Sequence, residues 1–351
     1  MKRIFLFIIM LFFIPLNVLA KSNTSTIAID YKSGRIIYKE NENAKKLIAS
    51  ITKVMTCIVV LENSDINKTI TVGDEVLLSY GTNIYIEVGE IITIKDLLYG
   101  LMLRSGNDAA ITLAVNTLGE EEFVKKMNEK AKEIGMNNTI FENPHGLDES
   151  SQNISTALDM ALLARYAFGN KVYREIINTK KYIAQTNLKT YSWTNRVSIL
   201  STYKYCIGGK NGYTPKAGKT LISYAKKDDK IFIIVTLNDS DLYNHHKKLY
   251  DELFQKYDYY KIIDKNDFVV NSSLINNSLF LKNSFSYLLR KDEINKVSTL
   301  VEIKKNNDVE SGLVRIYLND SEIGKIKIYS KSNKKEDKRN IFQKIYDLFT
   351  R

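Results

Sequence analysis

Histidine and cysteine are scarce in this 351-residue chain, which contains three histidines and two cysteines. A histidine-based catalytic triad or a zinc site with several ligands therefore has little material to draw on. His245 and His246 are adjacent, so their side chains point in different directions and lack the i, i+4 geometry of a zinc-binding helix. We interpret both as surface or structural residues, and we expect neither a metal site nor a cofactor.

The two cysteines give little basis for a disulfide framework. Cys57 and Cys206 could pair in an oxidising compartment. Cys57, however, falls on the apolar face of a helix predicted for residues 50–61. A buried free thiol is the simpler interpretation of this residue.

The chain opens with a short apolar run that is typical of a secretory signal. Lys2 and Arg3 form a charged head, residues 4–14 form an apolar core, and Ala20 supplies a small residue at the cleavage position. The alternative is an uncleaved anchor helix, although the run is short for a complete membrane span. We predict that residues 1–20 are a signal peptide and that the mature protein works at the outer face of the cytoplasmic membrane or in the cell wall.

Basic residues outnumber acidic ones, and the formal net charge of +11 falls to +9 when Lys2 and Arg3 leave with the signal. An excess of lysine can indicate binding to nucleic acid, but an exported protein meets an anionic wall or membrane surface instead. We expect no nucleic-acid partner.

The apolar pattern divides the chain into a mixed region and a β-rich region. Thr93 with Asp96 and Thr156 with Asp159 are predicted to cap two helices. After residue 260, apolar residues recur at every second position, as in strands. Predicted helices follow the Ser50 segment at residues 94–103, from 108, at 123–134 and at 156–168, and extended segments are predicted at 25–38 (a hairpin turning at 32–34), 193–205, 220–225 and 231–237. The predicted division is a signal at 1–20, a catalytic domain at 21–262, a small all-β domain at 263–330 and a terminal segment at 331–351.

The terminal segment begins with basic residues and continues with apolar residues at i, i+1, i+4, i+7 and i+8, the stripe of an amphipathic helix. A basic stretch followed by such a helix suits an anionic membrane surface. The alternative is a terminal helix docked on the protein, which periodicity cannot distinguish. The apolar positions are Ile341, Phe342, Ile345, Leu348 and Phe349.

Ser50 and Lys53, three residues apart, stand at the head of an apolar helical run. At this spacing both side chains lie on one side of a helix, one turn apart. Ser50 would lie in the first turn, where free N–H groups and the helix dipole favour developing negative charge. Lys53 could remove the serine proton if burial or a neighbouring cation lowers the lysine pKa. The pattern is so short, however, that most matches carry no function.

Two further short patterns follow in order. Ser105 and Asn107, separated by one glycine, join two predicted helices, so a hydroxyl and an amide would be exposed at one bend. The same residues are also ordinary in turns. Lys210, Asn211 and Gly212 open a strand, where the lysine could meet a carboxylate and the glycine would leave room for a substrate backbone. A plain hairpin turn is the alternative interpretation.

Taken together in this order, the three patterns resemble those of the serine D-alanyl-D-alanine carboxypeptidases, the low-molecular-mass penicillin-binding proteins. The resemblance extends over the blocks 47–56, 97–110, 143–148 and 207–214 and, with the signal, β module and tail, covers nearly the whole chain. It implies an α/β (α+β) fold of the penicilloyl serine transferase, β-lactamase-like type. In that fold an antiparallel sheet is covered by helices, and the cleft lies between the sheet and a helical subdomain.

The resemblance also implies catalytic roles. Ser50 would attack the carbonyl of the penultimate D-Ala and form an acyl-enzyme, with Lys53 as its base. Ser105 would relay the proton to the departing D-Ala. The implied substrate is the peptidoglycan stem peptide, and β-lactams are the implied inhibitors.

The substrate-binding residues follow from the same resemblance. Asn107 would hold Lys53 and the substrate amide, Lys210 would bind the terminal carboxylate, and the N–H groups of Ser50 and Tyr213 would form the oxyanion hole. The implied set is Asn107, Lys210, Asn211, Gly212 and Tyr213.

Asn211 departs from the family, whose third motif usually reads Lys-Thr-Gly. The threonine hydroxyl donates to the substrate carboxylate, and an asparagine amide can also donate, but it is longer and presents a carbonyl as well. Ordinary activity, altered β-lactam affinity and weakened catalysis are all possible, and we expect activity to be retained. A catalytically weakened wall-binding protein is therefore one alternative.

A β-lactamase is the second alternative, because class A enzymes share the motif order and add a glutamate that activates water. Glu149 and Asn153 have the Glu-x-x-x-Asn spacing. They follow a Pro-His-Gly loop that matches the peptidases, and His145 of that loop could face the cleft or be structural.

Overall fold

The computed structural model describes residues 23–269, 279–303 and 310–330. The predicted signal at 1–20 and the predicted amphipathic tail at 331–351 lie outside the described residues. No helix in the described ranges is both long enough and apolar enough to span a bilayer.

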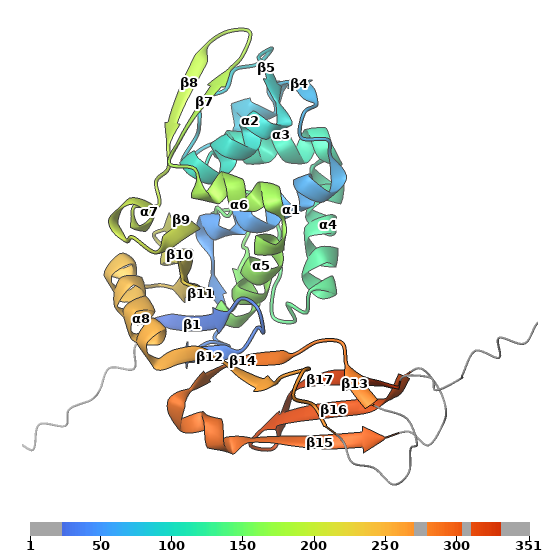
Figure 1. The fold of residues 1–351 in the computed structure, drawn as a ribbon. Coiled ribbons are helices and arrows are strands. Elements are labelled where there is room, and N and C mark those ends of the chain that lie inside the picture. Colours follow the sequence, from blue (N-terminus) through green and yellow to red (C-terminus); the bar gives the residue numbers. More distant parts are fainter. Residues whose placement is uncertain (1–22, 270–278, 304–309, 331–351) are drawn as a thin grey trace, which may run out of the picture.

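A five-stranded antiparallel sheet forms the centre of the predicted catalytic domain, in the order β2-β1-β11-β10-β9 (Figure 1). The predicted hairpin at 25–38 forms its first two strands, and β1 pairs with β11 so that Ile27 lies opposite Val235. Strand β9 lies at the edge, with only β10 as a neighbour. The bounds are β1 (Ser25–Asp30), β2 (Ile36–Glu40), β9 (Cys206–Thr214), β10 (Gly218–Lys227) and β11 (Lys230–Leu237).

Helices cover both faces of this sheet. On one face, Leu249 and Leu253 of α8 (Leu242–Lys256) pack with Phe232 and Ile234 of β11. On the other, α1 (Lys53–Asn63), α5 (Ala157–Gly169) and α6 (Lys171–Asn178) belong to the main apolar core. This arrangement confirms the predicted fold class.

The helical lobe lies beyond α1 and α6 (Figure 1). The predicted caps are present, since the Asp96 and Asp159 N–H groups donate to Thr93 Oγ1 and Thr156 Oγ1, each at 3.0 Å. Helix α2 is shorter than the predicted 94–103, because the chain continues from residue 100 as a π-helical turn. The elements are α2 (Ile94–Tyr99), η3 (Gly100–Arg104), α3 (Asn107–Thr117) and α4 (Glu120–Glu133).

The extended conformation predicted for residues 193–205 is only partly correct. Strand β8 (Thr190–Thr194) pairs with β7 (Lys181–Gln185) in a hairpin that projects from the helical lobe (Figure 1). The chain then forms a short helix, α7 (Ile199–Thr202). Ile199 and Leu200 are buried beside Leu221 and Leu242, so tertiary burial determines this turn of helix.

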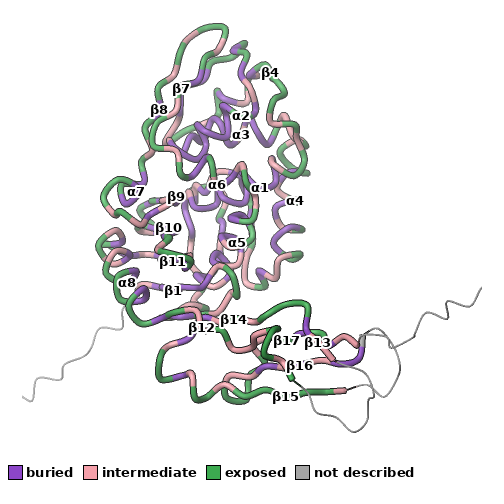
Figure 2. The backbone as a smooth tube through the Cα atoms, viewed as in Figure 1, coloured by how far each residue is buried: buried purple, intermediate pink, exposed green. Residues whose placement is uncertain are grey.

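The C-terminal region contains β12 (Tyr257–Ile263) paired with β14 (Phe285–Arg290) and a second sheet in the order β13-β17-β16-β15. Alternate apolar residues of β16 and β17 are buried as expected, among them Ile316 and Ile328. The edge strand β15 is mostly exposed (Figure 2). The domain boundary at residue 263 stays a prediction. The remaining strands of this sheet are β13 (Leu279–Leu281), β15 (Val297–Ile303), β16 (Glu310–Leu318) and β17 (Ser321–Ser330).

Candidate active site

Ser50 lies in a 3₁₀ turn, η1 (Ala49–Thr52), directly before α1 begins at Lys53. This differs from the prediction, which placed Ser50 in the first α-helical turn. Ala49 has a φ of +49°, and a Cβ on Gly146 would lie 2.0 Å from the Ala49 carbonyl oxygen. The 143–146 loop therefore packs directly against the backbone that carries Ser50, and the glycine is required by this contact.

The Lys53 amine is fully buried and contacts three oxygens. Nζ lies 2.6 Å from the His145 carbonyl oxygen, 2.7 Å from Asn107 Oδ1 and 3.1 Å from Ser50 Oγ. Burial holds the pKa of Lys53 well below its usual range, and the charge of Lys210 lowers this pKa further. The amine can therefore be neutral and accept the Ser50 proton across the 3.1 Å contact.

The second motif brings a hydroxyl and an amide to one bend, as predicted. Ser105 connects η3 to α3 in a left-handed conformation with a φ of +65°. Asn107 begins α3, one residue earlier than predicted, and its N–H and Nδ2 donate to the Thr82 and Tyr80 carbonyls at 2.7 and 2.6 Å. These two hydrogen bonds hold the backbone and the side chain of Asn107, so its Oδ1 is directed at Lys53.

Lys210 of β9 links the sheet to the second motif. Its buried Nζ donates to Ser105 Oγ at 3.0 Å and to the Asn211 carbonyl at 2.6 Å. Burial and, after it, the charge of Arg196 lower the pKa of Lys210 to about 7. A bound carboxylate would favour the charged form of this lysine.

Gly212 makes a close approach that the sequence did not predict. A Cβ at this position would lie 2.7 Å from both the Ser50 nitrogen and Thr220 Oγ1. The space that the glycine provides is thus occupied by the turn that carries Ser50, which approaches the β9 backbone closely. Any contact of Gly212 with substrate stays a prediction.

Asn211 and Tyr213 occupy the part of β9 that borders a cavity of about 560 Å³, shared with α7 and the start of α8. Burial raises the pKa of Tyr243, and interactions with Ser198 and with the side chain of Asn211 oppose this rise. Tyr213 is 64% exposed. The strand side of the site is therefore more open than the helical side.

The histidines have structural surroundings. His145 Nδ1 accepts the Leu147 N–H at 3.1 Å, and burial followed by the Lys53 charge lowers the pKa of His145 to about 3. His246 is buried between Ser223 Oγ and Thr236 Oγ1, and His245 pairs with Asp239 at 2.6 Å. No cluster of three potential metal ligands occurs within residues 23–269, 279–303 and 310–330.

Sequence reasoning missed several residues of this site. Arg196 and Tyr80 come from loops with no motif of their own, so no sequence signal marks them. The sequence draws attention to the ring of His145, whereas its backbone carbonyl contacts Lys53. The sequence marks Asp108 only as the start of a helix, although this residue directly follows the second motif.

Comparison with known proteins identifies the family of the chain. Residues 16–241 match the peptidase S11 family model, described as D-alanyl-D-alanine carboxypeptidase. The chain is 32% identical over 305 residues to the D-alanyl-D-alanine carboxypeptidase DacF of Bacillus subtilis, covering 82% of this chain and 78% of DacF. It is 33% identical over 243 residues to DacC of Escherichia coli, covering 64% and 59%.

Solved structures give the same result. The carboxypeptidase DacD of Francisella tularensis superposes with a TM-score of 0.67 at 27% identity, covering 88% of this chain and 92% of DacD. Penicillin-binding protein 6B of Escherichia coli gives 0.69 at 26% identity, covering 86% and 93%. The family match and these relatives show that the chain, in which Lys53 contacts Ser50, belongs to the D-alanyl-D-alanine carboxypeptidase family S11, whose members are serine hydrolases.

Proposed function

We propose that this chain removes the terminal D-Ala from peptidoglycan pentapeptide stems through an acyl-enzyme on Ser50. The observation that carries this proposal is the buried Lys53 amine, 3.1 Å from Ser50 Oγ, with its pKa depressed by burial and by Lys210. A base must be unprotonated to accept a proton, and this environment favours the neutral amine.

Acylation would proceed in one proton circuit. Lys53 takes the Ser50 proton while Oγ attacks the carbonyl of the penultimate D-Ala, and the bond to the terminal D-Ala nitrogen breaks. Ser105, which accepts a hydrogen bond from Lys210, would give its hydroxyl proton to the departing amine and receive in its place the proton that Lys53 took from Ser50, so that Lys53 becomes neutral again. Water would then attack the ester, with Lys53 taking a proton from the water and giving it to Ser50 Oγ as the shortened peptide leaves.

Binding of the substrate would use both sides of the cleft. Lys210 is suited to the terminal carboxylate, Asn107 to the peptide amide, and Asn211 donates at the rim of the cavity. The Ser50 and Tyr213 N–H groups would hold the oxyanion, where a single donor is typically worth about 3 kcal/mol. The absence of a Cβ at Gly212 keeps a side chain away from the Ser50 nitrogen.

A β-lactamase is less well supported. The Glu149 side chain is exposed. Asn153 is buried and donates to Thr52 Oγ1 and to the Asn143 carbonyl, both at 3.0 Å, which commits it to the shape of the 143–146 loop. These contacts favour a structural role for Asn153.

The intact mass of the mature protein, followed over time with benzylpenicillin, tests the proposal. We expect a lasting adduct on the parent and none on Ser50→Ala, and D-Ala release from a pentapeptide by the parent alone. Consumption of the drug without an adduct would indicate a β-lactamase. An untouched drug and an unmodified protein would indicate a catalytically silent wall-binding protein.

Export and membrane contact are part of the proposal. The signal at 1–20 would place the enzyme outside the cytoplasmic membrane, and the tail at 331–351 would hold it on the membrane surface. Unchanged membrane association after deletion of residues 341–351 would contradict the anchor.

A further inference from the structure

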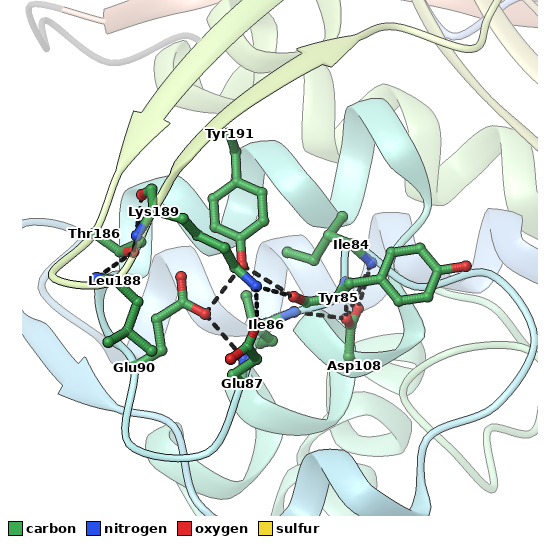
Figure 3. A network of polar contacts seen from close by, with 10 residues as sticks. All are labelled: Ile84, Tyr85, Ile86, Glu87, Glu90, Asp108, Thr186, Leu188, Lys189 and Tyr191. Atoms are coloured by element: carbon green, nitrogen blue, oxygen red, sulfur yellow. Dashed lines mark hydrogen bonds and ion pairs between the residues drawn. The ribbon is translucent and has the colours of Figure 1, made fainter.

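The carboxylate of Asp108, next to Asn107 in α3, is buried among backbone N–H groups (Figure 3). Oδ2 accepts the N–H of Tyr85 at 2.7 Å, of Ile84 at 3.0 Å and of Ile86 at 3.4 Å. Oδ1 accepts the N–H of Ile84 at 3.0 Å and of Ala109 at 2.8 Å. Three successive residues therefore direct their N–H groups at one carboxylate.

Such convergence requires an unusual backbone, and Tyr85 has a φ of +63°. Successive N–H groups that point inward form a concave anion site. Here the anion belongs to the protein itself, so the contact fixes segment 84–86 against α3. The strained backbone of Tyr85 persists because the surrounding contacts impose this conformation.

The same segment leads back to the groups that hold Asn107. The carbonyls of Tyr80 and Thr82 accept from Asn107 at 2.6 and 2.7 Å, and Asn83 Oδ1 accepts the Asp108 N–H at 3.2 Å. Residues 80–86 are thus attached at both ends to the start of α3. Asn107 Oδ1 lies 2.7 Å from Lys53 Nζ, so these contacts connect residues 80–86 to the proposed base.

Asp108 also acts on Lys53 through its charge. The charged groups that act on the Lys53 pKa are Lys210 from β9 and Asp108 from α3, and His145 from the 143–146 loop, whose pKa is about 3, is neutral near pH 7. The negative charge of Asp108 opposes the effects of burial and of Lys210 on the Lys53 pKa.

We propose that Asp108 is a positioning residue for the Lys53–Asn107 pair: its carboxylate fixes the segment that orients Asn107, and its charge acts on the Lys53 amine. This inference rests on the proposed role of Lys53. It assigns to Asp108 no contact with substrate.

The β7–β8 hairpin provides a matched control, because it holds the same segment from the opposite side (Figure 3). Lys189 Nζ and the Tyr191 hydroxyl donate to the Tyr85 carbonyl at 2.9 and 3.1 Å. Lys189 also pairs with Glu87, in a contact that is open to solvent. Exposed pairs of this kind contribute little, so loss of Lys189 removes a contact to the segment at small cost and leaves the contacts of Asp108 in place.

The experiment compares acylation by benzylpenicillin in the parent, Asp108→Asn and Lys189→Met as a function of pH. An asparagine offers one carbonyl oxygen, so its NH₂ group must face at least one of the backbone donors. We expect the maximal acylation rate of Asp108→Asn to fall roughly tenfold to a hundredfold. Lys189→Met should remain within about threefold of the parent.

The pH profile separates the charge from packing. Removal of the Asp108 charge should lower the Lys53 pKa, so the acidic limb of the profile should move to lower pH. A merely loosened site would admit water to Lys53, raise its pKa and move the limb to higher pH. A fall of less than about tenfold, an unmoved or raised limb, or an equal loss in Lys189→Met would overturn the proposal.

A measurement on the parent serves if Asp108→Asn does not fold. Exchange protection of the Ile84, Tyr85 and Ile86 amides, corrected for intrinsic exchange, should fall as acidification protonates Asp108, whose pKa burial raises. Protection that is constant through this titration would overturn the proposal. A parent that benzylpenicillin does not acylate would instead contradict the proposed function.

Discussion

The two walls of the site, one formed by helices and one by β9, are built differently. On the helical wall, Lys53 and Asn107 are buried and each contacts three other residues, most of them from distant parts of the chain. On the strand wall, Lys210 is equally buried, but Asn211 and Tyr213 border an open cavity. A change on the helical wall must disturb several contacts at once, whereas the outer residues of β9 have room to adjust. This difference explains how the third motif can depart from the family while the first two stay intact.

Replacement of the base should have the largest effect. Lys53→Met keeps the length of the apolar stem but removes the amine, and we expect the acylation rate to fall roughly 10²- to 10⁴-fold. The measurement is the rate at which benzylpenicillin acylates Lys53→Met, compared with the parent. A fall of less than about tenfold would exclude Lys53 as the base.

The same variant tests whether the pKa of Lys53 is depressed in the folded chain. Because the Lys53 pKa is lower in the folded than in the unfolded chain, the unfolded state binds more protons between the two values. The unfolding free energy of the parent should therefore rise relative to Lys53→Met as pH increases toward about 10.4. Urea titrations at several pH values would show this slope, and a flat difference would contradict it.

Gly212→Ala should have the second largest effect, because it inserts an atom between the two walls. A Cβ would lie 2.7 Å from the Ser50 nitrogen, so η1 or β9 must shift. We expect acylation to fall about a hundredfold and the unfolding free energy to fall by about 1–3 kcal/mol.

Gly169→Ala is the control for this prediction, since a Cβ there would meet nothing within 4 Å. Benzylpenicillin should acylate Gly169→Ala at the same rate as the parent. Normal acylation by Gly212→Ala would mean that the Ser50 turn is not held by its contact with β9.

Asn211→Thr should have the smallest effect. The threonine restores the residue that the family usually has, at a position where the cavity and Tyr243 already accommodate the asparagine. We expect the acylation rate to change less than about tenfold. A gain beyond about a hundredfold would show that the parent is impaired by Asn211.

The sequence was sufficient to predict the fold class and the residues that meet in the cleft. Ser50, Lys53, Ser105, Asn107 and Lys210 belong to short patterns whose order carries more information than any one of them. Side-chain caps at Thr93 and Thr156 were also predictable, because such contacts are local.

Features that depend on tertiary contacts were not predictable. The helix α7 forms because Ile199 and Leu200 are buried against a distant strand and helix. The closeness of Gly212 to Ser50 depends on how β9 packs against η1, and the contacts of Asp108 depend on the left-handed conformation of Tyr85. None of these distances is encoded in local spacing.

The two thiols have a practical consequence. Cys57 and Cys206 are both free and buried, in agreement with the interpretation of Cys57, and burial raises the pKa of Cys206 to about 11 and that of Cys57 further. A thiol is reactive as thiolate, so neither sulfur is available to oxidants or alkylating reagents while the chain stays closed. The rate at which a thiol reagent labels the native enzyme therefore reports how often its core opens, with Cys57 monitoring the helix behind Ser50 and Cys206 monitoring the start of β9.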